Sequence, residues 1–186
     1  MALLVTACGA TTPESGSAPP AMPDHPERSA EAKERHSFTT LDAMVTTSPV
    51  VVRGTVVKVA PGRSAGESDA DRIYFRNVTL QPDEVVKGVA ASEPVTFEEE
   101  GYEADGTGYV VNGLRWSNVG DQGWYFLDRG EDGVLFPISS YGKFVLRGDM
   151  RGPTGHDPAH EGPWIGQPIG RPDTVSAHVR QSGARK

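Results

Sequence analysis

The sequence has very little cysteine, no long apolar run and no cluster of basic residues. Cys8 is the only cysteine among 186 residues, so no internal disulfide can form and the domain depends on its core. No stretch of 18 or more apolar residues occurs, so we expect no membrane-spanning helix. Lys and Arg are scattered and the net charge is −7, which argues against a nucleic-acid partner, because phosphate contacts need a basic surface.

The chain also lacks the patterns of common catalytic sites. There is no G-x-S-x-G motif, and none of the five histidines falls within residues 37–148, the part predicted to fold as a domain. A nucleophilic triad needs a serine or cysteine, a histidine and a carboxylate held together. We therefore predict no catalytic residue and no cofactor, and favour a protein that is not an enzyme.

Three clusters of metal-ligand residue types do not complete a metal site. His156 and His160 have the i, i+4 spacing that grips zinc on a helix, but Pro158 and the nearby glycines disfavour a helix there. The acidic clusters at 67–71 and 98–100 lack the ligand spacing and glycine turn of a calcium loop. We predict no bound metal, and read both acidic clusters as solvated surface.

The amino terminus carries the most specific motif. Residues 5–8, Val-Thr-Ala-Cys, resemble the lipobox of bacterial lipoproteins. That resemblance implies a diacylglycerol on the Cys8 thiol, cleavage just before it, and 1–8 as a signal remnant. Seven residues precede Cys8 and none is basic, whereas an export signal needs a basic start and a longer apolar stretch, so we expect the true start upstream of Met1. An accidental match with a free thiol remains the alternative.

Residues 9–36 are rich in Ala, Pro, Ser, Thr and charged side chains. Such a composition buries too little surface to offset the entropy of ordering, so it predicts a flexible tether. An acyl anchor at Cys8 followed by a tether would place the domain at the extracytoplasmic face of the cell membrane.

Residues 37–148 show the signals of a β domain. Gly54 interrupts a β-branched run and predicts a bulge, since glycine tolerates the close approach that a bulge requires. A short helix is expected near 39–47, with Thr39 and Asp42 at capping-box spacing. Apolar alternation and turn residues predict strands at 50–59, 72–80 with an extension at 84–86, 95–98, 123–127, 134–136 and 144–146. Within the glycine-rich stretch 101–120, a further short strand at 109–111 is left open.

Five or six short strands with little helix predict an all-β fold, either a small barrel or a sandwich. After Gly148 the sequence becomes rich in glycine and proline, so 149–186 is expected to be an irregular tail. A short helix is predicted at 173–181, where Val175 and Val179 lie four residues apart on one face.

Three segments carry a resemblance to a known family. They are SPVVVRGTVVKV at 48–59, VTLQPDEVVKG at 78–88 and GDQGWYFLDR at 120–129. Together they resemble a family of uncharacterised secreted lipoproteins from high-GC Gram-positive bacteria. The resemblance spans about residues 38–148 and implies an OB-like barrel of the netrin or metalloprotease-inhibitor type. Pro82 departs from the apolar pattern, and the cysteines that the animal inhibitors use are lacking, so no inhibitory role carries over.

Aromatic residues concentrate in and near the glycine-rich loop at 101–120. Trp116, Tyr102 and Tyr109 are harder to bury than the aromatics of the 123–127 strand, and we predict a binding surface for a peptide or glycan on them. Packing of these rings beneath the loop is the alternative.

The sequence thus predicts a membrane-tethered extracytoplasmic lipoprotein that acts as a non-enzymatic binding or scaffold module. Its expected partners are the membrane, through the lipid anchor, and an envelope protein, peptide or glycan. The alternative is a cell-envelope enzyme or enzyme inhibitor that acts from the 101–120 loop.

Overall fold

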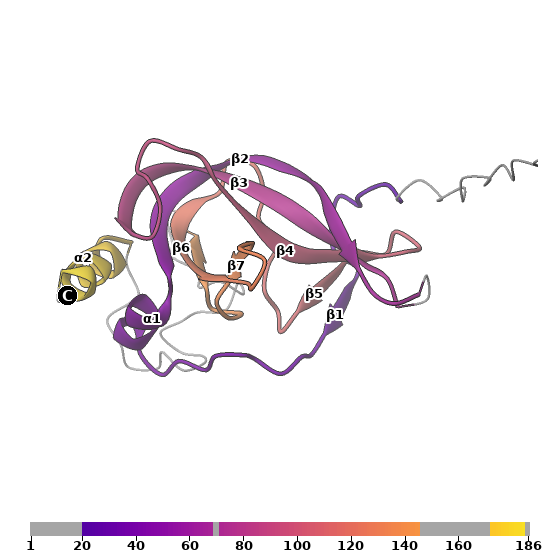
Figure 1. The fold of residues 1–186 in the computed structure, drawn as a ribbon, viewed down its shortest axis with the longest axis horizontal. Helices are drawn as coiled ribbons and strands as arrows, with labels where there is room; N and C mark the ends of the chain where they lie inside the picture. The colour runs from indigo at the N-terminus through magenta and orange to yellow at the C-terminus, as the bar shows by residue number, and fades with distance from the viewer. Residues whose placement is uncertain (1–19, 69–70, 146–171, 185–186) are drawn as a thin grey trace, which may run out of the picture.

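The computed structural model describes residues 20–68, 71–145 and 172–184, which form a curved antiparallel sheet, a small strand pair and two helices (Figure 1). The elements, in chain order, are β1 (Arg28–Ala30), α1 (Leu41–Thr47), β2 (Val50–Ala65), β3 (Ile73–Lys87), β4 (Val95–Glu103), β5 (Tyr109–Val111), β6 (Gln122–Arg129), β7 (Leu135–Pro137), β8 (Lys143–Val145) and α2 (Pro172–Gly183).

The main sheet has six strands in the order β4-β3-β2-β6-β7, and β8 also pairs with β6. All of its pairings are antiparallel. The sheet curls until β4 and β7 lie close together, but no ladder joins them in the described part of the chain. The prediction of a mainly β protein is therefore confirmed, while these residues do not form a closed barrel.

The two faces of the sheet bury separate cores, because side chains alternate along each strand. Val50 and Val52 lie on one face with Phe97 and Leu127, and Val51 lies on the other. The second face packs against α1 and α2, which lie together at one end of the sheet (Figure 1).

The expected bulge at Gly54 is present. The register of the β2–β3 ladder shifts between Arg53 and Gly54, and a Cβ on Gly54 would approach the Gln81 carbonyl oxygen to 2.5 Å. Glycine is the residue that allows this approach, so the bulge follows from the sequence. The strand predicted at 50–59 is longer than expected, since β2 continues to Ala65.

Both predicted helices form. Thr40, one residue after the expected cap, accepts a hydrogen bond from the Ala43 amide at 3.1 Å and begins α1. In α2, Val175 and Val179 are fully buried against the sheet. The Trp124 indole donates to the Ser176 hydroxyl at 3.0 Å, so this part of the predicted tail belongs to the domain. Neither described helix is long and apolar enough to cross a bilayer.

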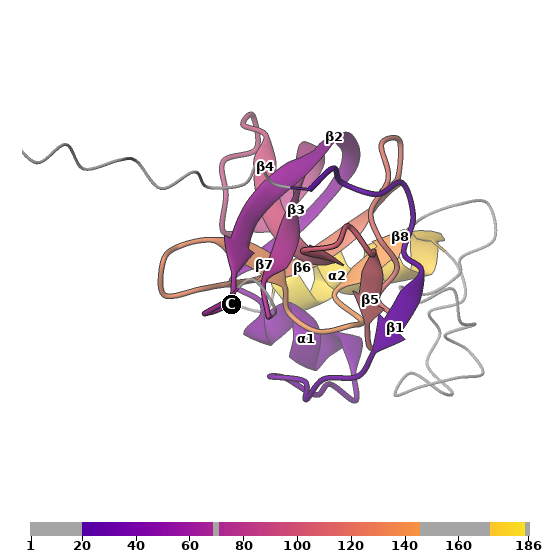
Figure 2. The same cartoon turned by 90° about the vertical axis from the view of Figure 1, so that its right-hand side faces the viewer.

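The tether predicted for residues 9–36 does not reach residue 36, because the chain is already held by the domain at β1. β1 pairs in parallel with β5, from Arg28 beside Tyr109 to Ala30 beside Val111. The chain then runs in extended form from β1 at one end of the molecule to α1 at the other (Figures 1 and 2). We call residues 27–36 the strap. The prediction failed here because the strap is held by backbone and polar contacts to distant residues, which composition does not report.

Candidate functional site

A cavity of about 370 Å³ lies between the strap, the edge of β4, the segment from β5 to Trp116, and the segment from β7 towards β8. Its walls combine aromatic, aliphatic, hydroxyl and charged side chains. The lining residues are Ala32, Lys33, Glu34, Arg35, Arg63, Phe75, Glu98, Glu99, Glu100, Val110, Val111, Asn112, Leu114, Trp116, Phe136, Pro137, Ile138, Ser139 and Ser140.

Asn112 fixes the strap as one wall of this cavity. It has a left-handed backbone, with φ of 50°, and its side chain accepts from the Ala32 amide at 2.8 Å. The same side chain donates to the Ala32 carbonyl and to Glu34, both at 2.9 Å. Glu34 in turn accepts from the Ser140 amide at 3.2 Å, so the strap is linked to two other walls. Asparagine suits this position because it tolerates the left-handed conformation.

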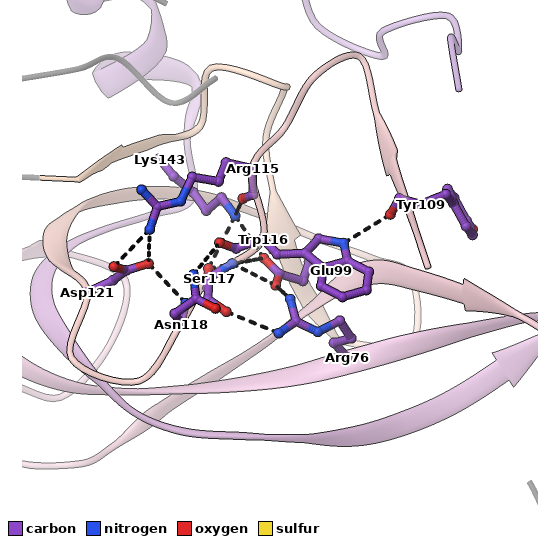
Figure 3. A network of polar contacts seen from close by, with 9 residues as sticks. All are labelled: Arg76, Glu99, Tyr109, Arg115, Trp116, Ser117, Asn118, Asp121 and Lys143. Atoms are coloured by element: carbon purple, nitrogen blue, oxygen red, sulfur yellow. Dashed lines mark hydrogen bonds and ion pairs between the residues drawn. The ribbon is translucent and has the colours of Figure 1, made fainter. Parts of the chain in front are cut away.

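The opposite wall contains a buried ionic cluster centred on Glu99 (Figure 3). One Glu99 carboxylate oxygen pairs with the guanidinium of Arg76, and the other accepts from Lys143 Nζ at 2.8 Å. Ser117 donates to the same carboxylate through its amide at 3.0 Å and its hydroxyl at 3.0 Å. All four side chains are buried.

The cluster positions the loop between β5 and β6. Lys143 Nζ also donates to the Arg115 carbonyl at 2.5 Å. Arg115 in turn donates to both carboxylate oxygens of the buried Asp121 at 3.0 Å (Figure 3). Burial is the main cause that lowers the pKa of Lys143 and of Arg76, and in each case the Glu99 carboxylate opposes it. Each side chain of the cluster that can carry a charge has a side chain of opposite sign in contact, as burial requires.

The three aromatic residues predicted to form a binding surface are buried, so the expectation of exposed rings was wrong. Tyr102 is 0%, Trp116 4% and Tyr109 7% exposed. The Trp116 indole donates to the Tyr109 carbonyl at 2.9 Å, and its ring lies against Gly108, where a Cβ would come within 2.8 Å of it. Of the three, Trp116 alone lines the cavity. Packing under the loop, the alternative, is what the structure shows.

The acidic cluster at 98–100 is also not a solvated surface. Glu98 and Glu99 are buried, and only Glu100 is largely exposed. The alternation of side chains along the strand could have predicted this burial. Glu99 lies two residues after the buried Phe97, on the same face of β4, and directly opposite Arg76 on β3. A charged residue on the inward face of a strand needs a buried partner, and two such partners are present.

Each aromatic ring that lines the cavity has an arginine over it. The guanidinium carbon lies 4.1 Å from the ring centre for Arg76 over Trp116 and 5.5 Å for Arg63 over Phe75. Arg35 lies 5.2 Å from the centre of Phe136. Cation–π contacts of this kind stiffen the cavity wall and leave the other ring faces and edges for packing.

The other residues singled out in the sequence lie away from the cavity or outside the described part of the chain. Cys8, His156 and His160 lie outside the described residues. Within the described ranges no group of three His, Cys, Asp or Glu could hold a metal ion. Asp71 of the 67–71 cluster caps its own turn by accepting from the Ser68 hydroxyl and from the amides of Glu67 at 3.0 Å and Ser68 at 2.6 Å. These hydrogen bonds, that of the hydroxyl foremost, lower the pKa of Asp71 to about 2.

No model of a known protein family matches the chain, and no curated protein matches its sequence. The assignment of a function therefore rests on the cavity and its walls.

Replacing Asn112 by glycine tests how the strap is held. Asn112→Gly keeps the left-handed backbone but removes three side-chain hydrogen bonds to the strap. At about 1 kcal/mol for each net hydrogen bond, the Ala32 amide should exchange with solvent on the order of 100-fold faster. Hydrogen exchange measured by NMR reads this directly, with amides of β2 as the internal control. Unchanged exchange at Ala32, or an equal rise throughout β2, would contradict the assignment.

Proposed function

We propose that this protein is a non-enzymatic binding module whose ligand occupies the cavity behind the strap. The cavity itself carries the proposal. Its volume of about 370 Å³ lies within the range of small-molecule sites, roughly 300–1,000 Å³. Apolar rings with a few placed polar groups are typical of such sites, and Ser139 and Ser140 supply hydroxyls beside Phe136.

The lining residues favour binding over catalysis. In the described part of the chain they include no histidine and no cysteine. The Glu34 carboxylate beside Ser140 accepts from the Ser140 amide and the Asn112 side chain, so it serves to hold the strap. The buried Glu99 accepts hydrogen bonds from Arg76, Lys143 and Ser117 and therefore serves to hold the wall. The alternative of an enzyme gains no support from these groups.

We further propose that the protein is a lipoprotein anchored through Cys8 at the extracytoplasmic face of the cell membrane. The lipobox-like residues 5–8 support this proposal. A ligand would then come from the envelope, as a peptide, a glycan or part of an envelope protein. We also propose that the curled sheet is an open relative of the OB-like barrel, on the basis of its six antiparallel strands and the sequence resemblance.

Filling the cavity tests the proposed function. Ala32 lies on the strap, is exposed and lines the cavity, so Ala32→Trp should block it with little effect on folding. Ala30 on β1 is exposed and lies outside the lining, so Ala30→Trp is the matched control. NMR screening of the full chain against envelope peptides and sugars should find a ligand that shifts the amides of 98–100 and 110–112. Ala32→Trp should abolish these shifts and Ala30→Trp should not. Binding elsewhere, or no ligand for the cavity, would overturn the proposal.

Metabolic labelling tests the anchor. Cells expressing the gene with its upstream reading frame, grown with an alkyne fatty acid, should incorporate the label into this protein. Cys8→Ala should remove the label, because the thiol is the attachment point. Labelling that persists in Cys8→Ala, or is missing from the unaltered protein, would contradict the anchor.

A further inference from the structure

The carboxylates of the cavity wall differ in their ionic partners. Four carboxylates line the cavity, and two of them pair with cations. Glu98 pairs with Arg63 at 2.8 Å, and Glu99 pairs with both Arg76 and Lys143. Glu99 thus has two cations against its one carboxylate.

The other two, Glu34 and Glu100, form no ion pair within the described residues. Glu34 accepts only from the neutral Asn112 side chain and the Ser140 amide. Desolvation by burial raises the pKa of Glu100, and its hydrogen bond with the Tyr109 hydroxyl opposes this shift. Neutral donors hold these two carboxylates in place but do not cancel their charge, so each is available to pair with a cationic ligand.

The cations of the lining do not pair with Glu34 or Glu100. Arg63 is shared between Glu98 and Asp132, the latter at 2.7 Å. Arg35 lies over a ring and 3.7 Å from Asp128. Lys33 lies on the strap, and no ion pair joins it to either carboxylate among the described residues.

An aromatic ring lies next to the uncompensated carboxylate. Phe75 stands directly opposite Glu100 in the β3–β4 ladder, and both side chains line the cavity. Val111 and Leu114 extend the apolar surface. A carboxylate without a counter-ion beside aromatic and aliphatic walls is suited to a ligand with a positive group and an apolar body.

We infer that the cavity binds an organic cation, a ligand whose ammonium or guanidinium group pairs with Glu100 while its apolar part packs beside Phe75. This inference rests on the proposed function and adds the chemical class of the ligand. A basic side chain of an envelope peptide or an amino group of a glycan would both present such a cation. Glu34, on the strap, is a second lining carboxylate without a cationic partner among the described residues.

Two probes that differ in charge test the inference. Phenethylammonium and 3-phenylpropionate share an aromatic body and carry opposite charges. In NMR titrations of the full chain, the ammonium should shift the amides of 98–100 and 110–112, and the carboxylate should not. Glu100→Gln should weaken binding of the ammonium about tenfold. Glu93→Gln makes the same charge change at an exposed residue outside the lining and should leave binding unchanged.

The outcomes separate this inference from the proposed function. If the carboxylate binds in the cavity as well as the ammonium, or if Glu100→Gln leaves ammonium binding unchanged, the cation inference is overturned while the cavity stands as a binding site. If neither probe binds but a neutral or anionic ligand is blocked by Ala32→Trp, the inference is again overturned and the proposed function survives. Failure of the Ala32→Trp experiment overturns both.

Discussion

The carboxylate of Glu99 is the contact on which the site depends. It receives hydrogen bonds from a side chain of β3, a side chain of β8 and two groups of Ser117 in the loop before β6. Together with β4, which carries Glu99, four segments of the chain therefore meet at one buried charge. Taking charges out of water is costly, and removing one partner of a buried pair typically costs about 3–5 kcal/mol. Such a cluster tolerates few arrangements, which is how it determines the position of the loop.

The cavity is a consequence of that fixed loop. The β5–β6 connection carries Asn112 at one end, where it holds the strap, and Ser117 near the other, where it meets Glu99. Trp116 lies between them, with its ring against Arg76 and its indole bonded to the Tyr109 carbonyl. The loop thus holds the strap and the edge of β4 apart, and a cavity remains between them. A preformed cavity of this kind binds a ligand without first having to order its walls.

Much of the fold could be predicted from the sequence, and the site largely could not. Alternation and β-branched runs predict where β2 to β8 begin to within one residue, although β2 and β4 continue well past their predicted ends and β1 was not predicted. Gly54 predicts the bulge, and Val175 with Val179 predicts the helix on the tail. These signals are local. The strap depends on Asn112, which is 80 residues from Ala32, and its own composition is that of a tether. Likewise three successive glutamates resemble a solvated surface. Only the alternation along β4, which puts Glu99 on the same face as Phe97, and the pairing of Glu99 with Arg76 on β3 show that Glu99 is buried.

A double-mutant cycle on Glu99 and Lys143 tests this account most directly. The free energies of unfolding of the unaltered protein, Glu99→Gln, Lys143→Met and the double variant would be measured by urea denaturation. If the cluster acts as a unit, each single change destabilises the protein and the double change costs clearly less than their sum, with a coupling of about 1 kcal/mol or more. Additivity to within about 0.5 kcal/mol would show that the two residues act independently, and would contradict the role given to Glu99.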